Sequence, residues 1–350
     1  MCLPNTRRCW IATMCMLSPL LCASQQTPGN FISFQVPGAA WTLPMSVNDS
    51  MVVTGYYLES GGYPRGFLRN ADGDITTFVV SGSSLTSPVA INAAGEIAGN
   101  SVTGSDFYGF VRYANGSIAT FNPGGTYPGY TDVAGINKEG IVVGGYAPTN
   151  GVPPEHGFIR NLNGTITTFD VPGSDRTQPV AINNAGEITG VYWFDGNVHE
   201  GGFIRSADGN ITTFGGTPVG INAEGSIVGW SILEGGSKEG FERNPYGTIK
   251  PLDLKLAYGA PPNMGITEAG SIFTSSSVQG AQGTGVFLEP PYGTSISLLF
   301  PGSYNTLGTS INDSDVITGT YYLYTYVNPG NHIAVQCICG FLWMPEVDNH

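Results

Sequence analysis

The sequence predicts an all-β protein, a seven-bladed β-propeller whose blades are four-stranded antiparallel sheets. One phrase recurs seven times: a small residue, an apolar residue, an asparagine position, a tight turn and an apolar strand that ends in glycine. The asparagine positions, which number the units one to seven, are Asn48, Asn92, Asn137, Asn183, Asn222, Thr267 and Asn312. Successive copies are 44, 45, 46, 39, 45 and 45 residues apart. A period in the forties is typical of a propeller or a solenoid array.

The N-terminal segment is expected to be removed before the protein folds. Arg7 and Arg8 precede a mostly apolar run over residues 9–22, followed by small residues. This is the pattern of a secretory signal peptide, predicted over residues 1–24. Because the run is too short for a transmembrane helix, we expect no membrane span. The sequence therefore predicts a single propeller domain over residues 25–350, secreted to the extracellular space or the periplasm, with the export route left open.

Each unit is expected to contain four short strands, as the fourth unit illustrates. Residues 179–183 form the first strand, and a turn leads to the second strand at 187–192. The third strand covers 202–205, and a turn at Asp208-Gly209 leads to the fourth at 211–214. Alternating apolar residues with Asx-Gly turns are typical of antiparallel strands joined by hairpins.

The two ends of the chain complement each other. The seventh unit ends with its third strand at residues 340–343, and residues 31–38 match the fourth strand of other units, such as 167–173. We therefore expect the N-terminal strand to complete the last blade and close the ring. An open solenoid would instead need capping repeats.

The first strand of each unit is predicted to be the innermost. The residue two positions before the asparagine is always small: Ser46, Ala90, Gly135, Ala181, Gly220, Gly265 and Ser310. Small side chains suit strands that converge on a common axis. The asparagine itself is expected to hydrogen-bond to the backbone of its own turn, which favours a structural role over ligand binding.

Composition excludes several classes of partner. The net charge is −13, and about −15 once Arg7 and Arg8 are removed, so the acidic protein is not expected to bind nucleic acid. No phosphate-binding, zinc or nucleophile motif is present, and no cofactor or metal is expected. Cys337 and Cys339, the only cysteines outside the signal peptide, are either disulfide-bonded or free thiols. We expect a monomer.

Function is expected in the loops that the repeat leaves unspecified. Loops between second and third strands, and connections between units, vary in length and gather on the face opposite the asparagine turns. Aromatic side chains there suit stacking on sugars or anchoring of peptides. The predicted ligand-binding residues are Tyr57, Trp193, Phe194, His199, Glu200, Trp230 and Tyr322.

The sequence favours catalysis less than ligand binding. Five residues before the asparagine, at the mouth of the first strands, stand Leu43, Ser87, Asp132, Gln178, Thr217, Pro262 and Leu307. One carboxylate is a poor start for a glycosidase, which generally uses two. The sequence therefore predicts a non-enzymatic propeller that binds an extracellular carbohydrate or protein. The alternatives are a secreted polysaccharide hydrolase or lyase, or a structural cell-surface protein.

The repeated phrase resembles that of a known family. Units that combine "AINNAGEITGVY", "GFIR" and "DGNITTF" are similar to the bacterial extracellular HAF-repeat proteins, and the matching triplet is His156-Gly157-Phe158. Other units carry Arg65, Tyr108, Gly201 or Glu239 at the histidine position. The resemblance covers residues 31–343 and is weakest in the sixth unit. It implies export, and no activity or catalytic residue.

Overall fold

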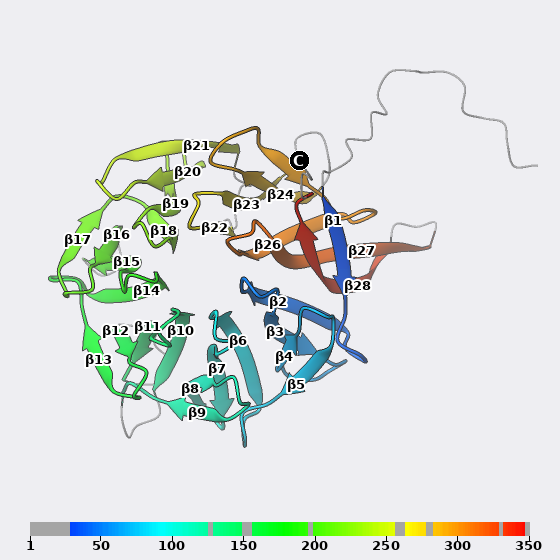
Figure 1. Ribbon diagram of the computed structural model, residues 1–350, viewed down its shortest axis with the longest axis horizontal. Helices are drawn as coiled ribbons and strands as arrows, with labels where there is room; N and C mark the ends of the chain where they lie inside the picture. Colours follow the sequence, from blue (N-terminus) through cyan, green and yellow to red (C-terminus); the bar gives the residue numbers. More distant parts are fainter. Residues whose placement is uncertain are drawn as a thin grey trace, which may run out of the picture.

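The computed structural model describes residues 29–124, 129–148, 156–194, 199–255, 263–277, 283–328 and 332–346. The described residues form 28 strands and no helix, hence no helix able to cross a membrane. Figure 1 shows the sheets standing around a common centre, with first strands inside and fourth strands outside. The predicted all-β architecture of four-stranded antiparallel blades is confirmed. The predicted signal peptide, 1–24, lies outside the described residues.

Five sheets contain four strands each, all paired antiparallel in chain order. The second unit forms β6 (Leu85–Ile91), β7 (Ile97–Thr103), β8 (Asp106–Arg112) and β9 (Ile118–Phe121). The third forms β10 (Tyr130–Ile136), β11 (Val142–Ala147), β12 (His156–Arg160) and β13 (Ile166–Phe169). The fourth forms β14 (Arg176–Ile182), β15 (Ile188–Phe194), β16 (His199–Arg205) and β17 (Ile211–Phe214). The fifth forms β18 (Thr217–Ile221), β19 (Ile227–Ile232), β20 (Lys238–Arg243) and β21 (Ile249–Lys255). The sixth forms β22 (Met264–Ile266), β23 (Ile272–Ser277), β24 (Thr284–Glu289) and β25 (Ile296–Leu298).

The first and last units share one eight-stranded sheet. The first unit supplies β2 (Trp41–Val47), β3 (Val53–Leu58), β4 (Arg65–Arg69) and β5 (Ile75–Phe78). The seventh supplies β26 (Asn305–Ile311), β27 (Ile317–Asn328) and β28 (His332–Met344). As the sequence predicts, the N-terminal strand β1 (Asn30–Phe34) pairs antiparallel with β28. A disulfide joins Cys337 to Cys339 on β28.

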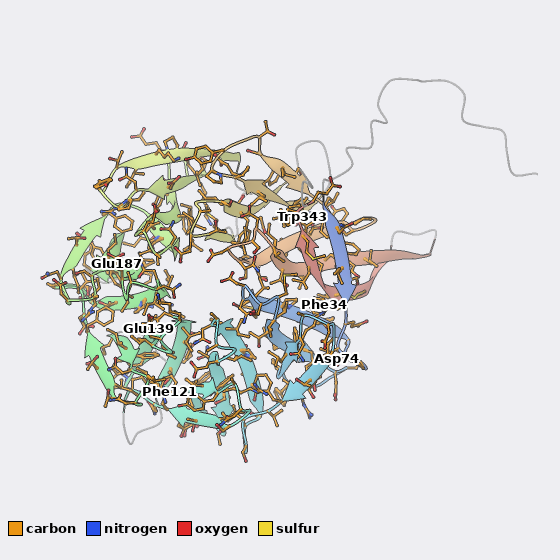
Figure 2. All side chains as sticks on the ribbon, viewed as in Figure 1. Phe34, Asp74, Phe121, Glu139, Glu187 and Trp343 are labelled. Carbon is orange, nitrogen blue, oxygen red and sulfur yellow. A yellow bond between two sulfur atoms is a disulfide. The ribbon has the colours of Figure 1, made fainter. Side chains whose placement is uncertain are left out.

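The hydrophobic core lies between neighbouring sheets (Figure 2). In five successive units a third-strand phenylalanine packs edge-on against a phenylalanine of the preceding outer strand, with ring centroids 5.7–6.3 Å apart. The pairs are Phe34–Phe67, Phe78–Phe110, Phe121–Phe158, Phe169–Phe203 and Phe214–Phe241. Such edge-to-face pairs contribute beyond their buried area, so each unit is packed on the one before it.

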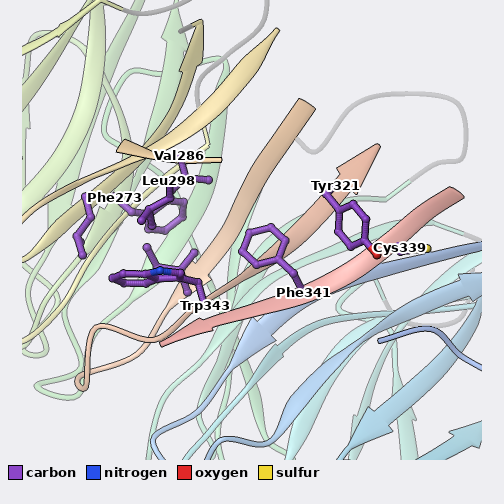
Figure 3. Close-up of a cluster of buried hydrophobic side chains, with 9 residues drawn as sticks. Phe273, Val286, Leu298, Tyr321, Cys339, Phe341 and Trp343 are labelled. Atoms are coloured by element: carbon purple, nitrogen blue, oxygen red, sulfur yellow. The ribbon is translucent and has the colours of Figure 1, made fainter. Parts of the chain in front are cut away.

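An arginine covers each outer-strand ring. The guanidinium carbon lies 5.1–5.2 Å from the ring centroid, a cation–π geometry. We call this contact the Arg–Phe latch, formed by Arg69, Arg112, Arg160, Arg205 and Arg243. In the seventh unit Trp343 takes the register position of the arginine and is fully buried against Phe273 and Leu298 (Figure 3).

The asparagines link each turn to the next one. Their Oδ1 atoms accept N–H groups of their own turn, as Asn183 does from Ala185 and Glu187. Their Nδ2 atoms also donate to the carbonyl oxygen of the next turn, at 2.8–3.4 Å. These bonds join Asn48 to Asn92, Asn92 to Asn137, Asn137 to Asn183, Asn183 to Asn222, Asn222 to Thr267, and Asn312 to Asn48. The expectation that each asparagine serves only its own turn was therefore incomplete.

The small residues before the turns bring neighbouring first strands together. Ser46 Oγ accepts the N–H of Ile91 from the next unit, at 3.3 Å. A Cβ added at Gly265 would lie 2.5 Å from the Phe273 ring, so only glycine fits there. The first strands are therefore innermost, as predicted.

Thr267 is the natural variant of the asparagine. Its Oγ1 accepts the N–H of Ser271 at 3.0 Å, but a hydroxyl cannot reproduce the two amide N–H donors.

We predict that Thr267→Asn stabilises the protein by about 1 kcal/mol by adding the missing bond to the next turn. Asn183→Thr should lose about 1 kcal/mol and Asn183→Ala more, because alanine also leaves the buried turn N–H groups unpaired. Denaturant unfolding measures all three, and no loss for Asn183→Thr together with no gain for Thr267→Asn would contradict the linking role.

Candidate functional site

The face opposite the asparagine turns holds the start of every first strand. Among the described members of the mouth ring, Asp132 is the one carboxylate, beside Leu43, Ser87, Gln178, Thr217 and Leu307. Pro262 lies outside the described residues. Asp132 is therefore a departure from the repeat at the start of a first strand.

Asp132 lies on β10 and is held by the preceding sheet. Asn100 Nδ2 on β7 donates to its Oδ1 at 3.2 Å, and Asn100 Oδ1 accepts the Val133 N–H at 2.9 Å. A β-bulge follows Val133, and a Cβ at Gly144 of β11 would overlap the carbonyl oxygen of Asp132. The glycine thus permits the close approach of the two strands that sets the backbone of Asp132.

The carboxyl of Asp132 binds its proton more tightly than an ordinary aspartate. Burial raises its pKa, and the hydrogen bond from Asn100 offsets part of that rise. Tyr130 lies two residues earlier on β10, on the same side of the strand. Burial, and then the charge of Asp132, raise the pKa of Tyr130. The Phe107 ring packs against the Tyr130 ring, with centroids 4.8 Å apart. The site thus pairs a titrating carboxyl with a phenol that stays protonated.

Four of the predicted ligand residues lie together across the fourth and fifth units. Trp193 pairs with Glu200 across β15 and β16, and Thr217 pairs with Trp230 across β18 and β19. Glu200 Oε1 accepts the hydroxyl of Thr217 at 3.3 Å and so joins the two sheets. Phe194, adjacent to Trp193, is 38% exposed and stacks on Tyr192 with centroids 5.9 Å apart. We call Trp193, Glu200 and Trp230 the aromatic ridge.

Two cations cover the aromatic ridge. The Arg176 guanidinium carbon is 4.5 Å from the Trp193 ring centroid, and Lys238 Nζ is 4.4 Å from the Trp230 ring centroid. Cation–π contacts of this kind hold the indole rings in place. The ridge therefore combines apolar ring surface with positive charge in a protein that is acidic overall.

The remaining predicted residues lie elsewhere. Tyr57 is 6% exposed and packs in the core with Val53 and Phe67, so the structure places it among packing residues. Tyr322 on β27 lies near Tyr56 of β3, whose pKa is raised by burial and then by Tyr322. His199 pairs through its backbone with Phe194, and its side chain lies outside the described residues.

Asn100 is the residue of this candidate site that the sequence did not indicate. It occupies the position eight residues after the turn asparagine, a position filled in chain order by Tyr56, Asn100, Gly145, Val191, Trp230, Ser275 and Thr320. No residue type recurs there. Positions that the fold constrains carry the same residue type in successive units, so variation at this position is a sequence signal for a site outside the repeat. Among the described residues, no three His, Cys, Asp or Glu side chains gather to hold a metal ion.

Several known structures share this architecture over most of the chain. A streptogramin B lyase aligns over 90% of this chain and 97% of its own, at 14% identity and a TM-score of 0.56. Virginiamycin B lyase from Staphylococcus aureus aligns over 90% and 99%, at 15% identity and 0.55. The fold is that of a β-propeller. A puromycin hydrolase aligns over 87% of this chain and 54% of its own, at 14% identity and 0.56. No protein-family profile and no curated protein matches the sequence.

These comparisons correct the functional expectation. The sequence favoured a non-enzymatic binding propeller, but the similar propellers named above are two lyases and a hydrolase. They favour the hydrolase or lyase alternative over binding alone. At 14–15% identity the likeness shows the fold, so the reaction has to be argued from the residues of this chain.

The raised pKa of Asp132 has a consequence for stability. The folded state binds the Asp132 proton more tightly than the unfolded chain, whose ordinary pKa is 3.8. Folding stability is therefore lost as the pH rises from about 3.8 through the higher folded-state pKa. We predict that Asp132→Asn, which cannot ionise, gains stability over wild type through that interval and keeps the gain at neutral pH. Urea unfolding between pH 3 and 8 measures this difference, and a difference that stays constant with pH would contradict it.

Proposed function

We propose that this protein is an enzyme, a lyase acting on polysaccharide, with Asp132 as its acid–base residue. The observation that carries the proposal is the pair of Asp132 and Tyr130 at the mouth of the propeller. A half-exposed site whose carboxyl has a pKa raised by burial is a candidate functional site. The lyase and hydrolase propellers described above support an enzymatic role.

Elimination suits this pair better than hydrolysis. A glycosidase generally uses two carboxyl groups, and the described mouth ring contains one. Elimination needs one base and one acid. The Asp132 carboxylate takes a carbon-bound proton, the C–H electron pair forms a C=C bond, and the C–O bond to the leaving sugar breaks. The Tyr130 phenol protonates that oxygen, and the proton on Asp132 then returns to the phenolate through solvent.

The substrate class follows from the same chemistry. The C–H next to the carboxyl group of a uronic acid is the most acidic C–H of the sugar ring once a cation neutralises that carboxylate, so a uronate is the sugar most suited to elimination. Arg176 and Lys238 lie over the indole rings of the aromatic ridge, and their positive charges are complementary to the carboxylates of a uronate chain. Within this proposal the substrate is therefore a uronate-containing polysaccharide, with the ridge binding the chain beside the reacting sugar.

We also infer that the propeller has seven blades. The eight-stranded sheet consists of two groups of four strands joined by one parallel pair, Trp41 with Ile338. The hydrogen bonds of the asparagine turns pass from Asn48 through the units, and Asn312 donates to Asn48. These features support the count, and an experimental density map of the ring tests it.

The proposal also includes export of the protein and its relationship to the HAF-repeat proteins. The segment 1–24 directs secretion, which places the enzyme where polysaccharide is available. N-terminal sequencing of protein recovered from the medium or the periplasm tests this: a start near residue 25 supports it, and retention of Met1 contradicts it.

The catalytic pair gives a direct prediction. Asp132→Asn should lower kcat/KM on uronate polysaccharides about 100-fold or more, because general acid–base catalysis is worth that much. Tyr130→Phe should lower kcat more than it raises KM. The ultraviolet absorbance of the unsaturated sugar measures elimination, whereas hydrolysis yields reducing ends without it. Asp74→Asn, on the exposed hairpin between β4 and β5 on the side of the asparagine turns, is the matched control.

Two outcomes would contradict this assignment. The first is a full rate of turnover in the folded Asp132→Asn variant. The second is the absence of turnover across a panel of uronate and neutral polysaccharides.

A further inference from the structure

Asn100 makes two hydrogen bonds to the first strand of the next unit. Its Oδ1 accepts the backbone N–H of Val133 at 2.9 Å, and its Nδ2 donates to Asp132 Oδ1 at 3.2 Å. A backbone N–H can only donate, so the amide oxygen must face Val133 and the amide NH2 group must face the carboxyl. The main chain therefore fixes the orientation of the Asn100 amide, whatever the charge on Asp132.

The hydrogen bond to Val133 meets a need of the fold. The residue four positions before the turn asparagine is, in chain order, Pro44, Pro88, Val133, Pro179, Pro218, Asn263 and Gly308. Proline has no N–H, so four units need no acceptor at this point. Val133 is buried, and its N–H would cost free energy if it stayed unpaired. An acceptor in the preceding unit is therefore required where valine replaces proline.

A hydroxyl is sufficient for that purpose, as the sixth and seventh units show. Ser275 stands in the sixth unit where Asn100 stands in the second, and its Oγ accepts the Gly308 N–H at 2.9 Å. The residue before Gly308, at the position of Asp132, is Leu307, which has no polar side-chain group. The NH2 group of Asn100 is thus the part that the fold does not require, and it donates to the one carboxylate in the described mouth ring.

The hydrogen bond from Asn100 distinguishes the two carboxyl oxygens of Asp132. Oδ1 accepts from the amide, and among the described residues no other hydrogen bond to this carboxyl is present. When the carboxyl is neutral, Oδ1 must still accept from the amide, so the proton resides on Oδ2. Oδ2 is therefore the oxygen that takes up and releases a proton.

We propose that Asn100 is the positioning residue of Asp132, which holds Oδ1 and presents Oδ2 to the substrate proton. The inference rests on the proposed lyase function and adds which oxygen of the base reacts. When the carbon-bound proton moves, the new O–H bond forms at Oδ2 while Oδ1 keeps its hydrogen bond to Asn100. The carboxyl cannot rotate without losing that bond, so the base stays in one orientation towards the substrate.

The other ionisable side chains around β10 have partners of their own. Burial raises the pKa of Asp132, and the Asn100 hydrogen bond opposes that rise. Tyr130, on β10 itself, has its pKa raised by burial and then by the charge of Asp132. Of the strands packed against β10, β6 and β7 carry no ionisable side chain. Those on β8, β11 and β14 contact other groups: Asp106 and Tyr108 each other, Arg112 the Phe78 ring, Tyr146 the His156 ring, and Arg176 the Trp193 ring.

Asn100→Ser tests the inference, because Ser275 shows that a serine at this position keeps the acceptor for the backbone N–H. The variant should fold and lose only the amide donor to Asp132. The ionised carboxylate then lacks a hydrogen bond, so the pKa of Asp132, measured by carbon-detected NMR, should rise above that of wild type. On a uronate polysaccharide, kcat should fall about tenfold or more with KM nearly unchanged, because a misplaced base slows the reaction without weakening binding. The rising limb of the pH profile should move upward with the NMR value.

Ser275→Ala is the matched control. It removes the equivalent acceptor in the sixth unit, and should lower stability while leaving the pKa of Asp132 and the pH profile as in wild type. The inference is overturned if folded Asn100→Ser keeps the wild-type pKa of Asp132, if it keeps the wild-type kcat, or if Ser275→Ala moves that pKa equally. The NMR titration needs no turnover, so failure of this inference is distinguishable from failure of the proposed function, which a wild type without turnover would contradict.

Discussion

The hydrogen bond from each asparagine Nδ2 to the next turn is the interaction on which the rest of the structure depends. A blade of four short strands has little core of its own, because its buried side chains lie between it and its neighbours. The asparagines fix the spacing of the turns, with Asn312 donating to Asn48 across the two ends of the chain. That spacing sets how the phenylalanine pairs meet, and it fixes the first strands whose opposite ends carry Asp132 and its neighbours.

Much of the fold could be predicted because the residues that the fold requires recur in several units of the sequence. Three features recur in the units: the small residue represented by Ser46 and Gly265, the turn asparagine and the Gly-Phe phrase. Each of them makes one recurring contact in the structure. The pairing of β1 with β28 was also visible, since residues 31–38 match the fourth strand that the seventh unit lacks. The bond between neighbouring turns was missed because a turn asparagine has a sufficient local explanation, and the sequence does not show which carbonyl its amide reaches.

The candidate site was less predictable, because its residues do not recur from unit to unit. Trp193, Glu200 and Trp230 do lie together, because strand register and one hydroxyl to carboxylate hydrogen bond connect two units. Tyr57 looked equivalent in sequence, yet its side chain faces the core. Asp132 was identified as an isolated carboxylate, but its partner Asn100 is 32 residues away in another blade, and its raised pKa comes from burial that no sequence pattern reports. The two lyases and the hydrolase named above share the fold, and they moved the interpretation from binding alone to the proposal of catalysis.

If the Asp132 carboxyl is the base of an elimination reaction, its own titration and the titration of the rate must coincide. Carbon-detected NMR of labelled aspartate gives the pKa of Asp132 in the free enzyme, which should lie above the ordinary value of 3.8. The pH profile of kcat/KM for a uronate polysaccharide reports the essential base of the same free enzyme. With Asp132 as the base, kcat/KM should rise with pH through the pKa measured for Asp132. A profile that titrates elsewhere, with Asp132 fully ionised across its rising limb, would contradict it.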